Sequence, residues 1–229
     1  MFYVVITSAS RPELIPMLVK SFKKYVTLPQ HSHIIFHEDV ISTEQSEQTL
    51  DYIRQNDFTD TLLVTDPAQG WAAALSRCFE IVKSNFVFFT SEDYEFERKV
   101  NVQDIISVMK SDEYVNQILL RQTPIRKSET NLTDFGRFSA YQAPKFNFHP
   151  GVWRTNYFLK YWNDTDYHYH PENTFNQNND LSGSYRIDGY NHMRHTGYHH
   201  RVQEWHRGMA PQLEKEKRDL KNRDPNGIS

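Results

Sequence analysis

The chain is short of cysteine: Cys78 is the only one among 229 residues, so no disulfide can form within it. A chain without disulfides is typical of a reducing compartment. No stretch reaches the roughly 18 apolar residues of a membrane-spanning helix, and the N-terminus lacks the charged start and long apolar region of a signal peptide. These absences predict a cytoplasmic protein without a membrane span, in the host cytoplasm if the chain is viral.

The chain also lacks an excess of positive charge. Its 26 Lys and Arg residues are outnumbered by 29 Asp and Glu residues, which gives a formal net charge of −3. Domains whose main partner is nucleic acid usually carry a basic excess, so the charge argues against such a partner. Hydrophobic residues make up 38% of the chain and aromatic residues 14%, enough for one large domain with its own core.

The first half of the chain alternates strand-like and helix-like segments. Apolar, β-rich runs predict strands at 2–7, 33–37 and 62–64 and another that starts at Phe86. Ser10 as N-cap with Pro12 just inside predicts the start of a first helix, whose helical spacing continues to Phe22. Further helices are predicted at 44–55, capped by Thr43, and from Gly70 to about Lys83. A helix at 102–111 and a strand near 116–121 follow. This order predicts an α/β fold with a mostly parallel, Rossmann-like sheet flanked by helices.

The most informative segment is the run that begins at Phe86 and ends in Glu92, Asp93 and Glu95. Carboxylates are kept out of a core unless something compensates them, so these acids should lie at the carboxyl end of a central strand. Open α/β sheets bind their ligands there. A divalent cation would relieve the repulsion among the acids and attract phosphate. The competing interpretation makes them first-turn acids of a following helix.

Three other segments are candidates for chemistry. Gly70 either lets a ligand approach the entrance of a helix, whose N-terminus favours anions, or is an ordinary loop glycine. Arg77, about two turns further on, faces either a phosphate or solvent. Trp153 follows a Pro-Gly turn and is either an exposed platform for a sugar or a core residue. Glu172, in an aromatic setting after a proline, is either a general base with a raised pKa or a surface acid.

Taken in order, these segments resemble the nucleotide-sugar glycosyltransferases of the GT-A fold, close to the inverting family 2 group, over roughly residues 2 to 200. In that family the first strand and turn contact the nucleotide base, the second strand supplies a carboxylate to the base or ribose, and the third helix lines the diphosphate. The resemblance implies that the nucleotide-sugar-binding residues are Thr7, Ser8, Arg11, Glu38, Asp39, Gly70, Trp71, Arg77 and Glu92.

The acidic stretch resembles the DxD motif of the family, whose Asp binds Mn or Mg, with Glu95 in place of the second Asp. A late His-x-Gly that begins at His195 resembles the segment that often gives the cation another ligand. The resemblance implies Asp93, Glu95 and His195 as metal ligands. It further implies Glu172 as the catalytic base. The neighbouring acids Asp164 and Asp166 are the alternatives if Glu172 proves dispensable. On the acceptor side it implies His149 and Trp153.

The implied activity is metal-dependent, inverting transfer of a sugar, of the hexosyltransferase class, from a UDP- or GDP-linked donor to a hydroxyl of a carbohydrate or glycoconjugate. One catalytic domain is expected at 1–207, with a nucleotide-sugar half at 1–100 and an irregular acceptor-side half at 101–207, followed by a charged helix or tail at 208–229. The alternatives are a non-catalytic nucleotide-sugar or glycan-binding module of this fold and a glycosyltransferase acting on modified DNA. A nucleotidyltransferase is a further alternative. Such enzymes usually have a glycine-rich phosphate loop after the first strand, and the segment from Ser8 to Pro12 contains no glycine.

Overall fold

The computed structural model describes residues 1–120, 131–143, 145–162, 175–177, 183–188 and 192–195. The candidate base Glu172, its alternatives Asp164 and Asp166, and the expected tail at 208–229 all lie outside these residues. The expected domain boundaries therefore stay predictions. Among the described residues, no helix is both long enough and apolar enough to cross a membrane.

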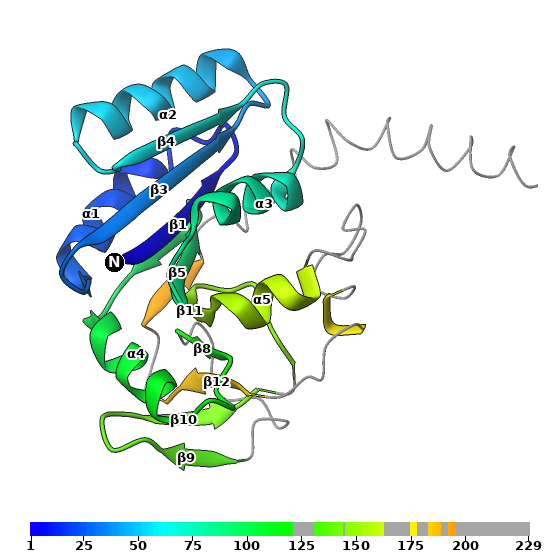
Figure 1. Cartoon of the computed structure of the whole chain (residues 1–229). Coiled ribbons are helices and arrows are strands. Elements are labelled where there is room, and N and C mark those ends of the chain that lie inside the picture. The colour runs from blue at the N-terminus through cyan, green and yellow to red at the C-terminus, as the bar shows by residue number, and fades with distance from the viewer. Residues whose placement is uncertain (121–130, 144, 163–174, 178–182, 189–191, 196–229) are drawn as a thin grey trace, which may run out of the picture.

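A nine-stranded sheet forms the centre of the molecule, in the order β4-β3-β1-β5-β11-β8-β12-β10-β9 (Figure 1). Its first four strands are all parallel to one another. They are β1 (Phe2–Ser8), β3 (Ser32–Asp39), β4 (Thr61–Thr65) and β5 (Phe86–Ser91). The helices that connect them are α1 (Ile15–Tyr25), α2 (Thr43–Gln55) and α3 (Trp71–Ile81). The predicted α/β fold class, with its large sheet flanked by helices, is confirmed.

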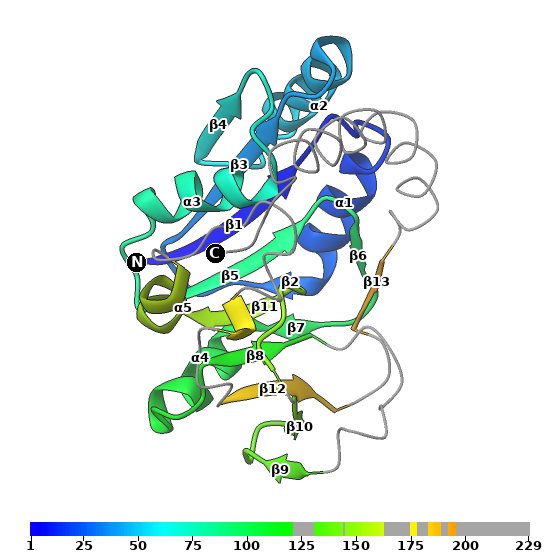
Figure 2. The same cartoon turned by 90° about the vertical axis from the view of Figure 1, so that its right-hand side faces the viewer.

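The second half of the sheet is built differently. Its strand β11 (Gly151–Arg154) runs antiparallel to both β5 and β8 (Gln117–Leu119), and β8 is parallel to β12 (Ser184–Ile187). The outer strands are β10 (Ser139–Gln142) and β9 (Leu132–Asp134), and the helices are α4 (Val102–Ser111) and α5 (Thr155–Trp162). Two short strand pairs lie outside this sheet, β2 (Val26–Thr27) with β7 (Val100–Asn101) and β6 (Tyr94–Phe96) with β13 (Met193–His195) (Figure 2).

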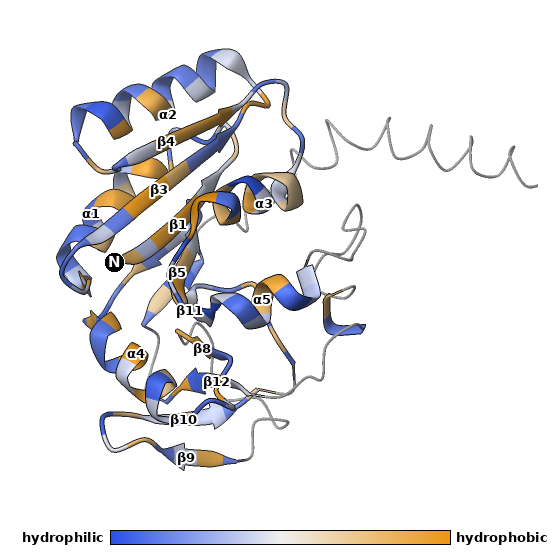
Figure 3. Ribbon diagram, viewed as in Figure 1, coloured by the Kyte–Doolittle hydropathy of each residue, from blue (hydrophilic) through white to orange (hydrophobic). Residues whose placement is uncertain are grey.

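Side chains of β1 alternate between two cores, as the period of a strand requires. Phe2, Val4 and Ile6 enter a core that also holds residues of α1, α2 and α4, whereas Tyr3 and Val5 enter a core with α3 and α5. Because both faces of the sheet are covered, all seven residues of β1 are buried and the strand is nearly continuously apolar. In Figure 3, orange for hydrophobic residues runs along much of the central strands, whereas the helices mix orange with the blue of hydrophilic residues.

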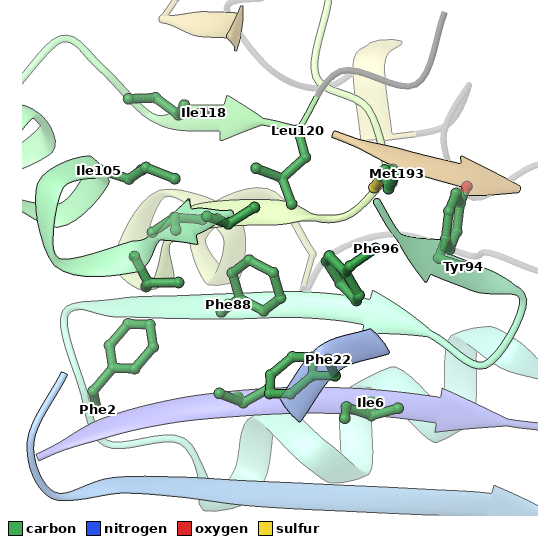
Figure 4. Close-up of a cluster of buried hydrophobic side chains, with 14 of the residues drawn as sticks. Phe2, Ile6, Phe22, Phe88, Tyr94, Phe96, Ile105, Ile118, Leu120 and Met193 are labelled. Carbon is green, nitrogen blue, oxygen red and sulfur yellow. The ribbon is translucent and has the colours of Figure 1, made fainter. Parts of the chain in front are cut away.

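Aromatic packing fixes β6 against the first of these cores. The ring of Phe22 in α1 lies edge-on to Phe88 in β5 and to Phe96 in β6, at centroid distances of 6.0 and 5.5 Å (Figure 4). Met193 of β13 is also fully buried in this core, beside Phe96 in the strand register. Apolar side chains of this core therefore hold the strand pair β6 and β13, which carries Tyr94 and His195, in place.

The predicted start of the first helix is wrong by several residues. The helix α1 begins at Ile15, with Leu14 as its N-cap residue and with no side-chain cap. Ser10 instead has a positive φ of 51°, and its hydroxyl accepts hydrogen bonds from the backbone N–H groups of Ile41 and Ser42. Its side chain binds the loop before α2, so it is not free to cap α1. The cap of α2 is Ser42, one residue before the predicted Thr43.

Candidate functional site

The predicted polar edge of the sheet exists at the carboxyl ends of β1, β3 and β5. Thr7 is paired in register with Ser91, and Ser8 with Glu38, and all four residues are buried. The backbone N–H of Glu92 donates to the carbonyl oxygen of Thr7 at 3.1 Å, so the turn after β5 is joined to the end of β1. The strand β6 follows this turn. The interpretation of the acids as the first turn of a helix is therefore wrong.

Arg11 compensates the charge of two of these acids. Its Nη2 atom donates to Oε1 of Glu92 in an ion pair, and its Nη1 atom lies 3.7 Å from Oδ2 of Asp93. The three side chains are 12%, 3% and 1% exposed, so water screens this contact weakly. Burial acts to lower the pKa of Arg11, but the two carboxylates outweigh it and hold the pKa above its ordinary value. Arg11 was predicted to contact the nucleotide; here it contacts the acids.

Asp93 is also oriented by Ser91 and His195. The hydroxyl of Ser91 donates to its Oδ1 atom at 2.7 Å, and Nε2 of His195 lies 2.9 Å from its Oδ2 atom. The His195 ring packs on Tyr94 at a centroid distance of 5.0 Å, and Tyr94 lies 6.2 Å from the ring of His149. The structure thus brings Asp93 and His195 together across about a hundred residues, and His149 also lies next to Tyr94.

Glu95 does not join this group. It lies between Tyr94 and Phe96, which both point into the core, so the alternation of the strand turns Glu95 to the other side. There its carboxylate forms an ion pair with Arg194, the residue opposite it in β13. The prediction that Glu95 binds the same cation as Asp93 and His195 is therefore not supported by this arrangement. Among the described residues, no group of three or more His, Cys, Asp or Glu side chains is placed to hold a metal ion.

Asp93 and His195 nevertheless fit a divalent cation as two of its ligands. Adjacent ligands of an octahedral ion with bonds of about 2.1 Å lie about 3 Å apart, which is close to the 2.9 Å between Oδ2 and Nε2. The oxygen and imidazole nitrogen are donors that such ions accept. Because a donor diphosphate and water supply oxygen ligands, two protein ligands are compatible with a cation held jointly with a substrate.

Glu38 is committed to the structure of the turn after β1. It is fully buried, and its Oε1 atom accepts hydrogen bonds from the backbone N–H of Ser10 and the hydroxyl of Ser46, both at 2.7 Å. The hydroxyls of Ser10 and Ser46 are themselves 2.7 Å apart. Burial raises the pKa of Glu38, while these hydrogen bonds oppose the shift. A direct contact with a nucleotide, as predicted for Glu38, would first require this network to open.

Asp39 holds the loop that leads into α3. Its two carboxylate oxygens accept the backbone N–H groups of Gln69 and Gly70 at 2.9 and 2.8 Å, and the side chain is almost fully buried. Gly70 is the N-cap residue of α3, with a φ of 90° and nothing within 4 Å of the position of a Cβ atom. The exposed Arg77 donates to Oε1 of Gln69. These residues come together, as predicted, but in the described structure they bind one another.

Both tryptophans assigned to ligands lie in the second core. Trp153 is 0% exposed and packs between Phe89 and Phe146, with ring centroids 4.5 and 5.2 Å away. The predicted role of Trp153 as an acceptor platform is wrong, and the core alternative is correct. Trp71 is half-buried and packs against Phe148 at 5.0 Å, so it shapes the helix entrance through the same aromatic cluster.

The segment before β11 is positioned by Gln117. The side chain of Gln117 donates to the carbonyl oxygen of Asn147 at 2.5 Å and accepts from its backbone N–H at 2.9 Å. The Oδ1 atom of Asn147 in turn accepts the backbone N–H of His149 at 3.0 Å. Because Gln117 is fully buried in β8, its hydrogen bonds to Asn147 help to fix the position of the half-buried His149 next to Tyr94.

Sequence reasoning missed three residues of this site. Ser91, Tyr94 and Gln117 each orient a predicted residue, but none carries a motif of its own. The signal for Ser91 was its position two residues before Asp93, at the end of a strand. The signal for Tyr94 was the aromatic residue inside the acidic stretch. Nothing local marks Gln117, because its partner lies thirty residues away in sequence.

Comparisons with known proteins give a result for the structure alone. No protein-family model matches the sequence, and no curated protein matches it either. The structure is similar to Staphylococcus aureus TarS 1–349 in complex with UDP-GlcNAc, with a TM-score of 0.61 and 13% identity over 84% of this chain and 57% of that one.

Two further solved structures are similar at the same low identity. The mannosyltransferase PcManGT from Pyrobaculum calidifontis, in complex with GDP-Man and Mn²⁺, matches with a TM-score of 0.51 and 13% identity over 69% of this chain and 46% of that one. GalNAc-T7 with UDP, GalNAc and Mn²⁺ matches with a TM-score of 0.58 and 13% identity over 85% and 43%. The first structures matched are longer, and the chain spans 36% to 60% of their length. The likeness concerns the fold, and the chain has the GT-A fold of these glycosyltransferases.

Proposed function

We propose that this chain is a glycosyltransferase that moves a sugar from a nucleoside-diphosphate sugar to an acceptor hydroxyl, with the help of Mn or Mg. The observation that carries the proposal is the convergence of Asp93 and His195 at the carboxyl edge of the sheet, where Oδ2 and Nε2 are in hydrogen-bond contact at 2.9 Å. Open α/β sheets bind nucleotides at this edge. The similar structures that contain UDP-GlcNAc, GDP-Man or Mn²⁺ support the same class of donor.

The residues around Asp93 would divide the work of binding. Asp93 and His195 would hold the cation, which supplies positive charge to the departing nucleoside diphosphate. Ser91 keeps the Asp93 carboxylate in a fixed orientation through its hydrogen bond to Oδ1. Gly70 leaves open space before the first turn of α3, where backbone N–H groups favour a phosphate oxygen. His149, held by Gln117 and Asn147, would face the acceptor.

The proposed displacement is inverting, with Glu172 as the base that removes the proton of the acceptor hydroxyl. The Glu172→Gln variant is expected to keep donor binding and to lose transfer by about two to four orders of magnitude, the usual worth of a general base. Transfer would be followed by release of the nucleoside diphosphate. Unchanged turnover would move the role of the base to Asp164 or Asp166.

A thermal-shift comparison with UDP-GlcNAc and GDP-Man, each with and without Mn²⁺, tests the proposal directly. A ligand that binds only the folded chain raises the melting temperature, so stabilisation by one donor that needs Mn²⁺ is the expected result. Release of UDP or GDP in the presence of a carbohydrate acceptor would then identify turnover. Absence of any shift with either donor would contradict the proposed donor class.

Two acids of the same hairpin provide a matched pair of variants. Asp93→Asn is expected to abolish the Mn²⁺-dependent shift, because Asp93 lies beside His195. Glu95→Gln makes the same change of charge two residues away and is expected to keep the shift, because Glu95 pairs with Arg194 on the other side. Equal losses in both variants would show that Glu95 also reaches the cation.

A non-catalytic nucleotide-sugar-binding module is the second candidate. The pairing of Glu95 with Arg194 favours it, since it leaves Asp93 as the one carboxylate of the described hairpin beside His195. Such a module would show the same metal-dependent shift with the donor but would release no nucleotide. The release assay with a range of acceptors therefore separates the two candidates.

A further inference from the structure

We infer that Arg11 is an internal counter-ion that competes with the cation for Asp93, so that the cation binds strongly only together with the nucleoside diphosphate. The inference rests on the proposed function for its second part, the coupling to the nucleotide. Its first part, the competition, concerns Arg11, Glu92 and Asp93 alone. It assigns Arg11 to the control of cation binding, in place of the contact with the nucleotide base that the family resemblance implies.

The geometry shows that Arg11 occupies part of the space around the proposed cation ligand. Its Nη2 atom is bound to Glu92, whereas its Nη1 atom lies 3.7 Å from Oδ2 of Asp93, too far for a hydrogen bond. That Nη1 atom is buried and has no hydrogen-bond partner among the described residues. The oxygen it approaches is the same Oδ2 that lies 2.9 Å from Nε2 of His195. Glu92 thus anchors the guanidinium, and Asp93 is shared.

A cation and the guanidinium cannot both approach that oxygen without strong repulsion. A cation bound about 2.1 Å from Oδ2 would lie within about 6 Å of Nη1, since Nη1 is 3.7 Å from the same oxygen. Both positive groups would be in a site where the carboxylates are 3% and 1% exposed, so solvent would screen them weakly. Arg11 therefore weakens the binding of a cation that arrives alone.

A nucleoside diphosphate changes this balance because it brings its own negative charge. Arg11 carries one positive charge against the two negative charges of Glu92 and Asp93, so these three side chains together carry one net negative charge, and a divalent cation turns it positive. The phosphates would restore the balance, and the unpartnered Nη1 atom offers them a donor. Cation and nucleotide therefore bind cooperatively, and by thermodynamic linkage each raises the affinity for the other by the same factor.

The test measures binding of Mn²⁺, followed as free Mn²⁺ by electron paramagnetic resonance, with and without UDP or GDP. Arg11→Gln is expected to bind Mn²⁺ alone at least about tenfold more tightly than the natural chain, because it removes the positive charge that repels the cation beside Oδ2 of Asp93. Arg11→Lys, whose ammonium lacks the planar fork that spans two carboxylates, is expected to fall between them. It carries the test if Arg11→Gln does not fold.

Arg194→Gln is the matched control. It also removes a guanidinium that is paired with a glutamate of the same hairpin, but its side chain is 61% exposed and pairs with Glu95. It is expected to leave Mn²⁺ affinity within about twofold of the natural value, because exposed ion pairs are weak and screened. In Arg11→Gln, the factor by which the nucleotide raises Mn²⁺ affinity is expected to shrink, while in Arg194→Gln it is expected to be retained.

The outcomes separate this inference from the proposed function. Mn²⁺ affinity that rises in neither Arg11 variant, or that rises equally in Arg194→Gln, overturns the role of Arg11. A rise in the Arg11 variants without any nucleotide binding in the natural chain supports the competition while the proposed donor fails. A nucleotide effect of the same size in Arg11→Gln and in the natural chain overturns the coupling.

Discussion

Asp39 offers the sharpest test of whether a predicted ligand residue is instead part of the framework. The structure gives its carboxylate two charge-assisted hydrogen bonds, from the backbone N–H groups of Gln69 and Gly70. In Asp39→Asn the amide oxygen can keep one of them, and the amide nitrogen then faces the other N–H group. The side chain is 4% exposed, so water cannot replace the lost partner without rearrangement.

The magnitude follows from these two contacts. Loss of one charged hydrogen bond and burial of a donor without an acceptor lower the free energy of unfolding by about 2–4 kcal/mol in all. The neighbouring Glu38 opposes this loss slightly, since Asp39 is one of the groups that raise its pKa, and removal of the charge relieves that repulsion. For a chain of this size, the melting temperature should fall by roughly 5–15 °C.

The assay is thermal and urea unfolding in the absence of any nucleotide or metal. Asp66→Asn is the control, because Asp66 is exposed in the same loop and the change of charge is identical. It should move the melting temperature by about 1 °C or less, as surface substitutions usually do. If Asp39→Asn melts at the temperature of the control, the clamp on the loop contributes nothing and Asp39 is free to act as a ligand.

Three further variants test the described structure. Arg154→Met should lower the free energy of unfolding by about 2–3 kcal/mol in urea titrations, because Nη2 of Arg154 donates to the carbonyl oxygens of Met109, Asp112 and Val115. Trp153→Ala should lower the free energy of unfolding by about 3–5 kcal/mol, and Trp153→Phe should lower it much less. If Trp153 were an exposed platform, neither substitution would change the free energy of unfolding much. Burial lowers the pKa of His37 below 6.5, so the unfolded chain binds more protons in that range. Stability should therefore fall as the pH drops below about 6.5, and His37→Asn should flatten this slope in calorimetry.

The parallel half of the fold was predictable because its signals are local. The strands β1, β3, β4 and β5 are each centred on an apolar run, and each helix shows its spacing within about a dozen residues. The acids were placed at the carboxyl end of β5 by the cost of burying charge, and that reasoning held. The predicted start of α1 was wrong because the side chain of Ser10 forms hydrogen bonds with a loop about thirty residues away in sequence.

The site was predictable in its residue types but less so in its pairings. The Pro-Gly pair before Trp153 left an exposed platform and a core position both open. In the structure Gly151 begins β11, where a Cβ atom would lie 2.4 Å from the carbonyl oxygen of Ile118. That glycine serves close packing of two strands, which one sequence cannot reveal. Glu95 could have been separated from Asp93 in advance, had residues 94–96 been recognised as a strand with alternating faces.

The position of Arg11 in the sequence decides which partner of the acidic turn is present while the chain is still being synthesised. Arg11, Glu92 and Asp93 all belong to the first 93 residues, whereas His195 follows Asp93 by another 102. Since synthesis proceeds from the N-terminus, the parallel half emerges with the guanidinium of Arg11 already available to pair with its two buried carboxylates. Pulse-labelled hydrogen exchange should find the amides of β1 and β5 protected before those of β6 and β13. The growing chain then carries a neutralised acidic turn through the interval before its histidine partner has left the ribosome.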